Sequence, residues 1–139
     1  MPSPLENLCG PGRPLTAEPR DAREFEGLRR SGTTRLADAR IEGLSLEGRF
    51  DLAYNAAHSL CLAALRWHGY RSQNRFIVFQ VLPHTLGLGP EVWRVLAKCH
   101  QVRNQSEYEG DAAVDARLVA DLLTACAQVL QKIEALPQP

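Results

Sequence analysis

The uneven distribution of proline constrains this fold more than any other feature of the sequence. Five of the nine prolines fall within the first nineteen residues, whereas residues 20–82 contain none. Because proline removes a backbone donor and breaks helix interiors, we expect residues 1–20 to form a flexible Pro/Gly-rich tail without a helix or core contacts. The proline-free stretch permits long helices, and residues 21–136 are expected to form one domain.

Four segments repeat apolar residues at helical spacing. They cover residues 21–39, 45–69, 89–110 and 111–136. Gly27 and Gly32 weaken the first, which we expect to be a broken or two-part helix. Ser45 and Asp111 are expected to cap the second and fourth helices, and Arg66 falls on the polar face of the second. The pattern predicts an all-α fold, an antiparallel up-and-down four-helix bundle.

The segment Asn74 to Leu82 is short, strongly apolar and closed by Pro83. Its composition is typical of a strand, because Ile77, Val78 and similar residues favour β structure. No second strand pattern is recognisable elsewhere in the chain, and a lone strand has no partner. We therefore expect an additional short buried helix between the second and third long helices.

The overall charge argues against a protein that binds nucleic acid through a general basic surface. Sixteen basic and sixteen acidic residues give a formal net charge of zero, so any nucleic-acid contact has to be local. The N-terminus lacks a signal-peptide pattern, and no apolar stretch reaches the roughly 18 residues of a membrane span. These features predict a cytoplasmic protein that makes no membrane contact.

The cysteines and most of the histidines are expected to be structural. Three cysteines fall on apolar helix faces, and none belongs to a C-x-x-C pair, so we expect no metal site and no cofactor. These cysteines are Cys61, Cys99 and Cys126, with Cys9 in the tail. Three histidines are expected to be structural or surface residues, namely His58, His68 and His84.

Arg103 is the residue that most strongly suggests a function. At about 100° per residue it falls within roughly 20–40° of the middle of an apolar stripe. That stripe contains Val92, Leu96 and Cys99. A buried arginine is costly without a partner, so this position predicts a carboxylate, a phosphate or a subunit interface beside Arg103.

Other polar residues accompany Arg103 on its helix. Trp93, His100 and Asn104 share one flank and would be able to stack on and hydrogen-bond a nucleotide. The same flank suits a dimer or bundle contact, where tryptophan is also common. Glu107 lies four residues after Arg103, so a simple helical ion pair is a further explanation for both residues.

Two segments resemble the HEPN family of helical domains. Residues 51–72 resemble its long alanine-rich helix, and RNQSEYEG at residues 103–110 resembles its arginine motif. The resemblance covers about residues 35–136 and implies a dimer in which arginine–histidine pairs form a metal-independent endoribonuclease site. Here Tyr108 stands in the place of the histidine. Glu107 and Tyr108 together resemble a branch whose members accompany nucleotidyltransferase-like proteins in toxin–antitoxin pairs.

Three functional hypotheses follow. The first is a HEPN-like homodimer that binds RNA or nucleotide phosphate, or a partner protein, without efficient catalysis. Its ligand-binding residues would be Trp93, Arg103, Asn104, Glu107 and Tyr108. The second is a metal-independent endoribonuclease in which Arg103 acts with Tyr108 or His100. The third is a structural adaptor without a ligand, in which Arg103 pairs with a carboxylate such as that of Asp51 or Glu107.

Overall fold

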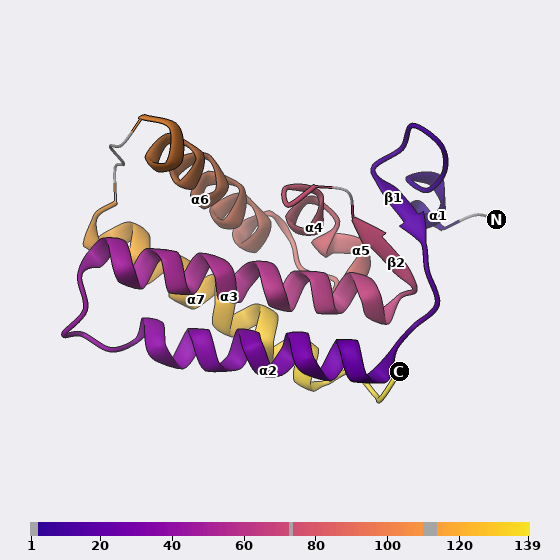
Figure 1. The fold of residues 1–139 in the computed structure, drawn as a ribbon, viewed down its shortest axis with the longest axis horizontal. Helices are drawn as coiled ribbons and strands as arrows, with labels where there is room; N and C mark the ends of the chain where they lie inside the picture. The colour runs from indigo at the N-terminus through magenta and orange to yellow at the C-terminus, as the bar shows by residue number, and fades with distance from the viewer. Residues whose placement is uncertain (1–2, 73, 110–113) are drawn as a thin grey trace.

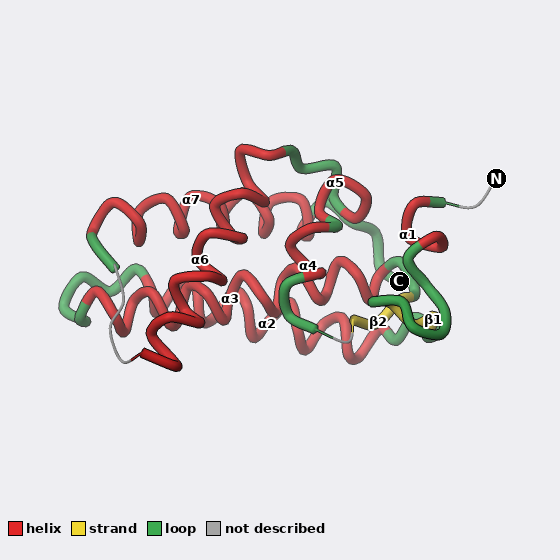
Figure 2. The backbone as a smooth tube through the Cα atoms, turned by 90° about the horizontal axis from the view of Figure 1, so that it is seen from above, coloured by secondary structure: helices red, strands yellow, loops and turns green. Residues whose placement is uncertain are grey.

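The computed structural model describes residues 3–72, 74–109 and 114–139, and for residues 106–109 it describes the backbone alone. Within these ranges the chain is mostly helical, as predicted, with one small antiparallel sheet (Figures 1 and 2). The long helices are α2 (Ala22–Ala39), α3 (Leu46–Trp67), α6 (Pro90–Glu109) and α7 (Ala116–Glu134). None of the described helices is both long and apolar enough to cross a membrane.

Helices α2 and α3 run antiparallel and side by side (Figure 1). The predicted break in α2 is wrong, because the helix is continuous from Ala22 to Ala39. Gly32 lies against α3, where an added Cβ would meet Cγ of Leu60 at 2.6 Å. The glycine therefore permits a close approach of the two helices and does not interrupt α2.

Helix α3 forms the centre of the core and packs against α2, α6 and α7. The hydroxyl of Ser45 accepts a hydrogen bond from the amide of Gly48, which confirms the predicted N-cap. Alanines in the middle of α3 are completely buried and let the neighbouring helices approach closely. They are Ala53, Ala56, Ala57, Ala63 and Ala64.

Helices α6 and α7 complete the set of long helices. Helix α6 begins at Pro90 and ends at Glu109, in agreement with the predicted arginine-bearing helix. Helix α7 is capped by the side chain of Asp115, which accepts a hydrogen bond from the amide of Leu118 at 2.8 Å. Because the helix begins at Ala116, the start that we expected, with Asp111 as the cap, was wrong by about one turn. Asp111 itself lies outside the described residues.

Residues 3–20 pack onto the long helices, contrary to prediction. They form a short helix, α1 (Pro4–Asn7), and a strand, β1 (Leu15–Ala17). Strand β1 pairs in antiparallel fashion with β2 (Tyr70–Ser72), and both Leu5 and Leu15 are buried. The expectation that this segment lacks helix and core contacts is therefore wrong, as is the expectation of a strand-free chain.

A buried arginine at the end of α3 holds the N-terminal segment in place. Arg66 is 2% exposed and donates hydrogen bonds to the backbone carbonyls of Glu18 and Pro19 at 3.0 and 2.5 Å. It also pairs with the carboxylate of Glu24 in α2. Arg71 of β2 bridges Glu18 and Glu24 at 2.7 and 2.6 Å, so four charged side chains join α2, α3 and the sheet.

The apolar segment between α3 and α6 is helical, as predicted, although it forms two short helices. They are α4 (Ile77–Gln80) and α5 (Leu82–Thr85), with Pro83 in the first turn of α5. The side chain of Asn74 accepts a hydrogen bond from the amide of Ile77 at 2.9 Å. This contact fixes the turn that leads into α4 and brings the preceding residues toward α6.

Candidate functional site

A polar cluster lies where α6 crosses α3. The hydroxyl of Tyr54 and Nδ1 of His100 are 2.8 Å apart, and Nδ2 of Asn104 lies 3.3 Å from Nε2 of the same ring. The guanidinium carbon of Arg103 lies 5.0 Å from the centre of the Tyr54 ring, within the range of a cation–π contact. The phenol of Tyr54 is completely buried and so joins the two helices beneath this cluster.

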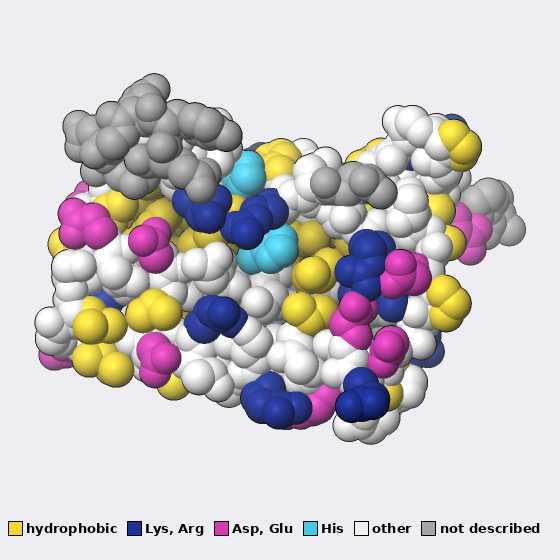
Figure 3. All heavy atoms as spheres, in the orientation of Figure 1, with side chains coloured by type: hydrophobic (Ala, Val, Ile, Leu, Met, Phe, Trp, Pro, Cys, Tyr) yellow, Lys and Arg dark blue, Asp and Glu magenta, His cyan; other side chains and the backbone are white. Residues whose placement is uncertain are grey.

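The segment before α4 contributes a second cationic group and an aromatic ring. Arg75 acts electrostatically on Tyr54 and on both histidines, His58 and His100. The ring of Phe76 lies 5.1 Å from that of His100, centre to centre. Figure 3 shows histidine and cationic side chains gathered where α6 approaches α3.

We call the residues Tyr54, His58, Arg75, His100, Arg103 and Asn104 the α3–α6 site. Helical spacing explains how α3 and α6 present these groups together. Tyr54 and His58 are four residues apart on α3, and His100 and Asn104 are four apart on α6, so each pair lies on one face of its helix. The site thus combines groups from three separate segments of the chain.

Both histidines of the site are held in the neutral state. Burial, together with the nearby charges of Arg75 and Arg103, lowers the pKa of His58 to about 4. Burial also lowers the pKa of His100, and the same two arginines act in the same direction. Burial raises the pKa of Tyr54. The site therefore groups neutral hydrogen-bonding side chains with two permanent positive charges.

Two hollows flank the Arg75–Phe76 segment. One, of about 490 Å³, is lined by α6 together with Phe76. The other, of about 190 Å³, has His58 and Arg75 among its lining residues. His100 lines the larger hollow, so one edge of the site opens into it.

The structure brings together three of the residues that the sequence predicted for the site. His100, Arg103 and Asn104 lie within one cluster. Trp93 lies two turns earlier on α6 and does not line the hollow beside His100, so it is not part of the cluster. The predicted roles of Glu107 and Tyr108 fall on side chains outside the described residues.

The sequence analysis did not single out Tyr54 or Arg75 for the site, nor Phe76 beside it. Tyr54 was visible as a member of the α3 apolar face, but its hydroxyl contact with α6 depends on how the helices pack. His58 was expected to be merely structural. Arg75 and Phe76 carry no periodic signal, because they lie in the turn before α4. A charged residue next to an aromatic one at the edge of an apolar segment was the only available hint.

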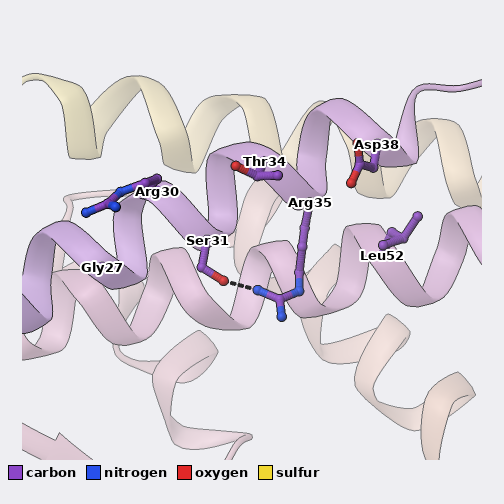
Figure 4. Close-up of a pocket in the computed structure, with 7 residues that line it drawn as sticks. All are labelled: Gly27, Arg30, Ser31, Thr34, Arg35, Asp38 and Leu52. Carbon is purple, nitrogen blue, oxygen red and sulfur yellow. Dashed lines mark hydrogen bonds between the residues drawn. The ribbon is translucent and has the colours of Figure 1, made fainter.

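Another hollow, of about 530 Å³, lies on the outer face of α2 (Figure 4). Ser31 and Arg35 hydrogen-bond with each other there, and Arg30 extends into solvent. Leu52 is the one lining residue from α3. Because the polar groups are exposed and lie along a single helix, this surface lacks the convergence of buried polar groups that marks a binding site.

The three cysteines predicted on apolar faces are buried in the core. Burial raises the pKa of Cys99 to about 12 and raises the pKa values of Cys61 and Cys126 as well. These thiols are consequently protonated and act as small apolar side chains. Among the described residues, no three His, Cys, Asp or Glu side chains are grouped so that they would hold a metal ion.

No family model matches the sequence, and no curated protein or solved structure is significantly similar to it.

Proposed function

We propose that the α3–α6 site binds the phosphate group of an RNA or a nucleotide. The observation that carries this proposal is the grouping of the guanidinium groups of Arg75 and Arg103 with two neutral histidines, His58 and His100. Arginine is suited to phosphate because its planar group donates several hydrogen bonds in a fixed geometry. A neutral imidazole adds a hydrogen bond without requiring a proton from solvent.

The buried phenol of Tyr54 supports this proposal, because it orders the groups that would meet the phosphate. Its hydroxyl contacts His100 at 2.8 Å, and its ring lies beneath Arg103. Groups that are already fixed lose less conformational entropy when a ligand binds. Such preorganisation favours recognition of a compact anion over a loose electrostatic contact.

The HEPN resemblance is consistent with this proposal and adds the expectation of a dimer. In that arrangement α2, α3, α6 and α7 form the four-helix bundle, and two copies place their Arg103 residues together. The same proposal includes a nucleotidyltransferase-like partner in a toxin–antitoxin pair. Sedimentation of the purified protein tests the dimer directly, because a monomer at micromolar concentration would contradict it.

Binding of a short 5′-phosphorylated oligoribonucleotide tests the phosphate site. We expect Arg103→Gln and Arg75→Gln to weaken binding by about ten-fold each, the loss expected for one charge-assisted hydrogen bond. Arg30→Gln is the matched control, because Arg30 is an exposed arginine on α2. Equal weakening by all three variants would indicate non-specific electrostatic binding and would contradict the proposal.

A second function, metal-independent RNA cleavage, is favoured by one observation. His100 is neutral and lies three residues from Arg103, so both side chains would be able to reach one phosphodiester. His100 would accept the proton of a 2′-hydroxyl as its oxygen attacks phosphorus, and Arg103 would stabilise the negative charge on the phosphorane oxygens. The bond from phosphorus to the 5′-oxygen would then break, and that oxygen would take a proton from the imidazolium or from water. Both ring nitrogens of His100 already have partners, Tyr54 and Asn104. This arrangement makes binding the first proposal and cleavage the second.

Incubation with mixed cellular RNA in EDTA separates the two functions. Cleavage by the wild type that is lost in both Arg103→Gln and His100→Gln would establish the nuclease. Uncut RNA, together with Arg103-dependent binding, would leave the binding function alone. Cleavage that persists in Arg103→Gln would identify a contaminating nuclease.

A further inference from the structure

The hollow beside His100 has the composition of a nucleobase site. Phe76 forms one side of it, and the ring of His100 stands 5.1 Å away at 40° to the phenyl plane. Ala97 leaves space along the helix, and Gln101 provides an amide. An aromatic face beside a polar amide suits a base, because every base has a flat π surface and a hydrogen-bonding edge.

Cationic side chains extend this hollow away from the proposed phosphate site. Arg94 and Lys98 line it and are four residues apart, so they lie on one face of α6. Arg103 lies beyond His100 in the opposite direction along the same helix. Positive charge is therefore present on both sides of the Phe76 ring, and none of the six lining residues is acidic.

We propose that the hollow between Phe76 and α6 receives the base of a nucleotide whose phosphate is held by Arg75 and Arg103. In a single-stranded RNA the next phosphate would then lie toward Lys98 and Arg94, so the strand would follow α6. This inference rests on the phosphate-binding function proposed above and names the part of the ligand that the phosphate site leaves undetermined. One helical turn, about 5–6 Å between side chains, separates His100 from Arg103, a spacing compatible with one nucleotide.

Comparison of three probes tests the base site separately from the phosphate site. The probes are inorganic phosphate, ribose 5-phosphate and adenosine 5′-monophosphate, and their affinities are measured by calorimetry. We expect the wild type to bind the nucleotide about ten-fold more tightly than ribose 5-phosphate, within the range for stacking of one base on an aromatic side chain. A 5′-phosphorylated dinucleotide should bind more tightly still, and Lys98→Gln should remove that additional gain.

Two variants remove the base site by different means. Phe76→Leu keeps an apolar side chain but removes the aromatic face, and Ala97→Met fills the hollow without deleting a contact. Both should bind the nucleotide and ribose 5-phosphate with equal affinity while they retain phosphate binding. Ala120→Met is the matched control for Ala97→Met, because Ala120 is an exposed alanine on α7. It should bind all probes as the wild type does.

The outcomes distinguish failure of this inference from failure of the phosphate site. Equal affinity of the wild type for the nucleotide and ribose 5-phosphate, with binding lost in Arg103→Gln, would overturn the base site and leave the phosphate site intact. Absence of binding to all three probes would overturn both. Equally tight binding of an acidic peptide that Ala97→Met weakens and Phe76→Leu does not would assign the hollow to a protein partner and overturn the nucleobase inference.

Discussion

At the scale of single residues, the α3–α6 site depends on two histidines that remain neutral. His58 and His100 lie beside the guanidinium groups of Arg75 and Arg103, which oppose the addition of further positive charge. Burial also opposes protonation of both histidines. The buried phenol of Tyr54 keeps its proton and so is a neutral partner for His100. Protonation of either histidine therefore conflicts with the folded arrangement.

Acid should weaken the fold through His58. Its pKa is about 4 in the folded protein and 6.5 in the reference state, so the unfolded chain binds the proton first. The stability present above pH 6.5 is progressively lost as the pH falls toward 4. Urea unfolding at about pH 7 and about pH 5 should show a lower unfolding free energy at pH 5, with a smaller decrease in His58→Gln.

The carboxylates affect the unfolding free energy in a different pH range. The effect of the histidines can therefore be measured separately. Glu18 and Glu24 have pKa values below the usual 4.5 because Arg71 and Arg66, respectively, donate hydrogen bonds to them. Their stabilisation is present above pH 4.5 and is lost only below it. His84 is exposed, so His84→Gln should show the same decrease as the wild type. An undiminished decrease in His58→Gln would contradict the role assigned to His58.

At the scale of structural elements, the close approach of α2 and α3 depends on Gly32. A Cβ at this position would meet two side-chain carbons of Leu60 at 2.6 and 2.7 Å and the carbonyl oxygen of Ala56 at 3.2 Å. Leu60 is itself fully buried, so its side chain has little room to move. Gly27, five residues earlier on the same helix, has open space around the corresponding position.

Alanine substitutions at these two glycines should have opposite effects. We expect Gly32→Ala to lower the unfolding free energy by about 1–3 kcal/mol, because the added methyl group overpacks the interface between the helices. Gly27→Ala should raise it by about 0.5–1 kcal/mol through higher helix propensity alone. Chemical denaturation of both variants measures the difference. If Gly32→Ala raised the unfolding free energy instead, α2 and α3 would be able to move apart at little energetic cost, which would contradict the need for a glycine here.

The elements that periodicity describes well were predictable, and those fixed by packing were not. The N-cap at Ser45 and the course of α6 follow from local sequence signals. The continuity of α2 does not, because helix propensity penalises Gly32 while the contact with α3 requires it. Strands β1 and β2 have three residues each, which is too short to leave an alternating apolar pattern.

At the scale of the whole molecule, Arg66 holds the N-terminal segment against the long helices. Periodicity placed this arginine on the polar face of α3, yet it is 2% exposed because β1, β2 and the start of α2 cover it. Its guanidinium group donates hydrogen bonds to three backbone carbonyls, those of Glu18, Pro19 and Tyr70, and pairs with the carboxylate of Glu24. Glu18 and Pro19, which contact Arg66, belong to the segment that we expected to be a flexible tail.

Removal of the buried arginine should destabilise the protein more than removal of its exposed neighbour. Arg66→Met would leave the backbone carbonyls of Glu18 and Pro19 without this donor and Glu24 with Arg71 as its remaining partner. We expect a loss of about 2–3 kcal/mol in unfolding free energy. Arg71 is 36% exposed, so Arg71→Met should cost less than about 1 kcal/mol. Thermal and urea unfolding compare the two variants. Equal losses would contradict a dominant role for Arg66.

The α3–α6 site was predictable only where it lies on one helix. The spacing of His100, Arg103 and Asn104 on α6 places them on adjacent faces from sequence alone. Tyr54 and Arg75 are distant from them in the chain, and their contacts exist because α4 and α6 both pack against α3. Through those contacts, Arg103 becomes part of a site that also contains a second cation, Arg75, and the fixed imidazole of His100.

Histidine ring resonances followed by NMR during titration with inorganic phosphate test the phosphate site most directly. A phosphate anion between Arg75 and Arg103 favours the protonated imidazole, so the pKa values of His58 and His100 should both rise on binding. Their signals should shift saturably in the wild type, those of His84 should not, and Arg103→Gln should abolish the response. Unchanged His58 and His100 signals up to about 10 mM phosphate, ten times a weak dissociation constant of about 1 mM, would contradict a phosphate site.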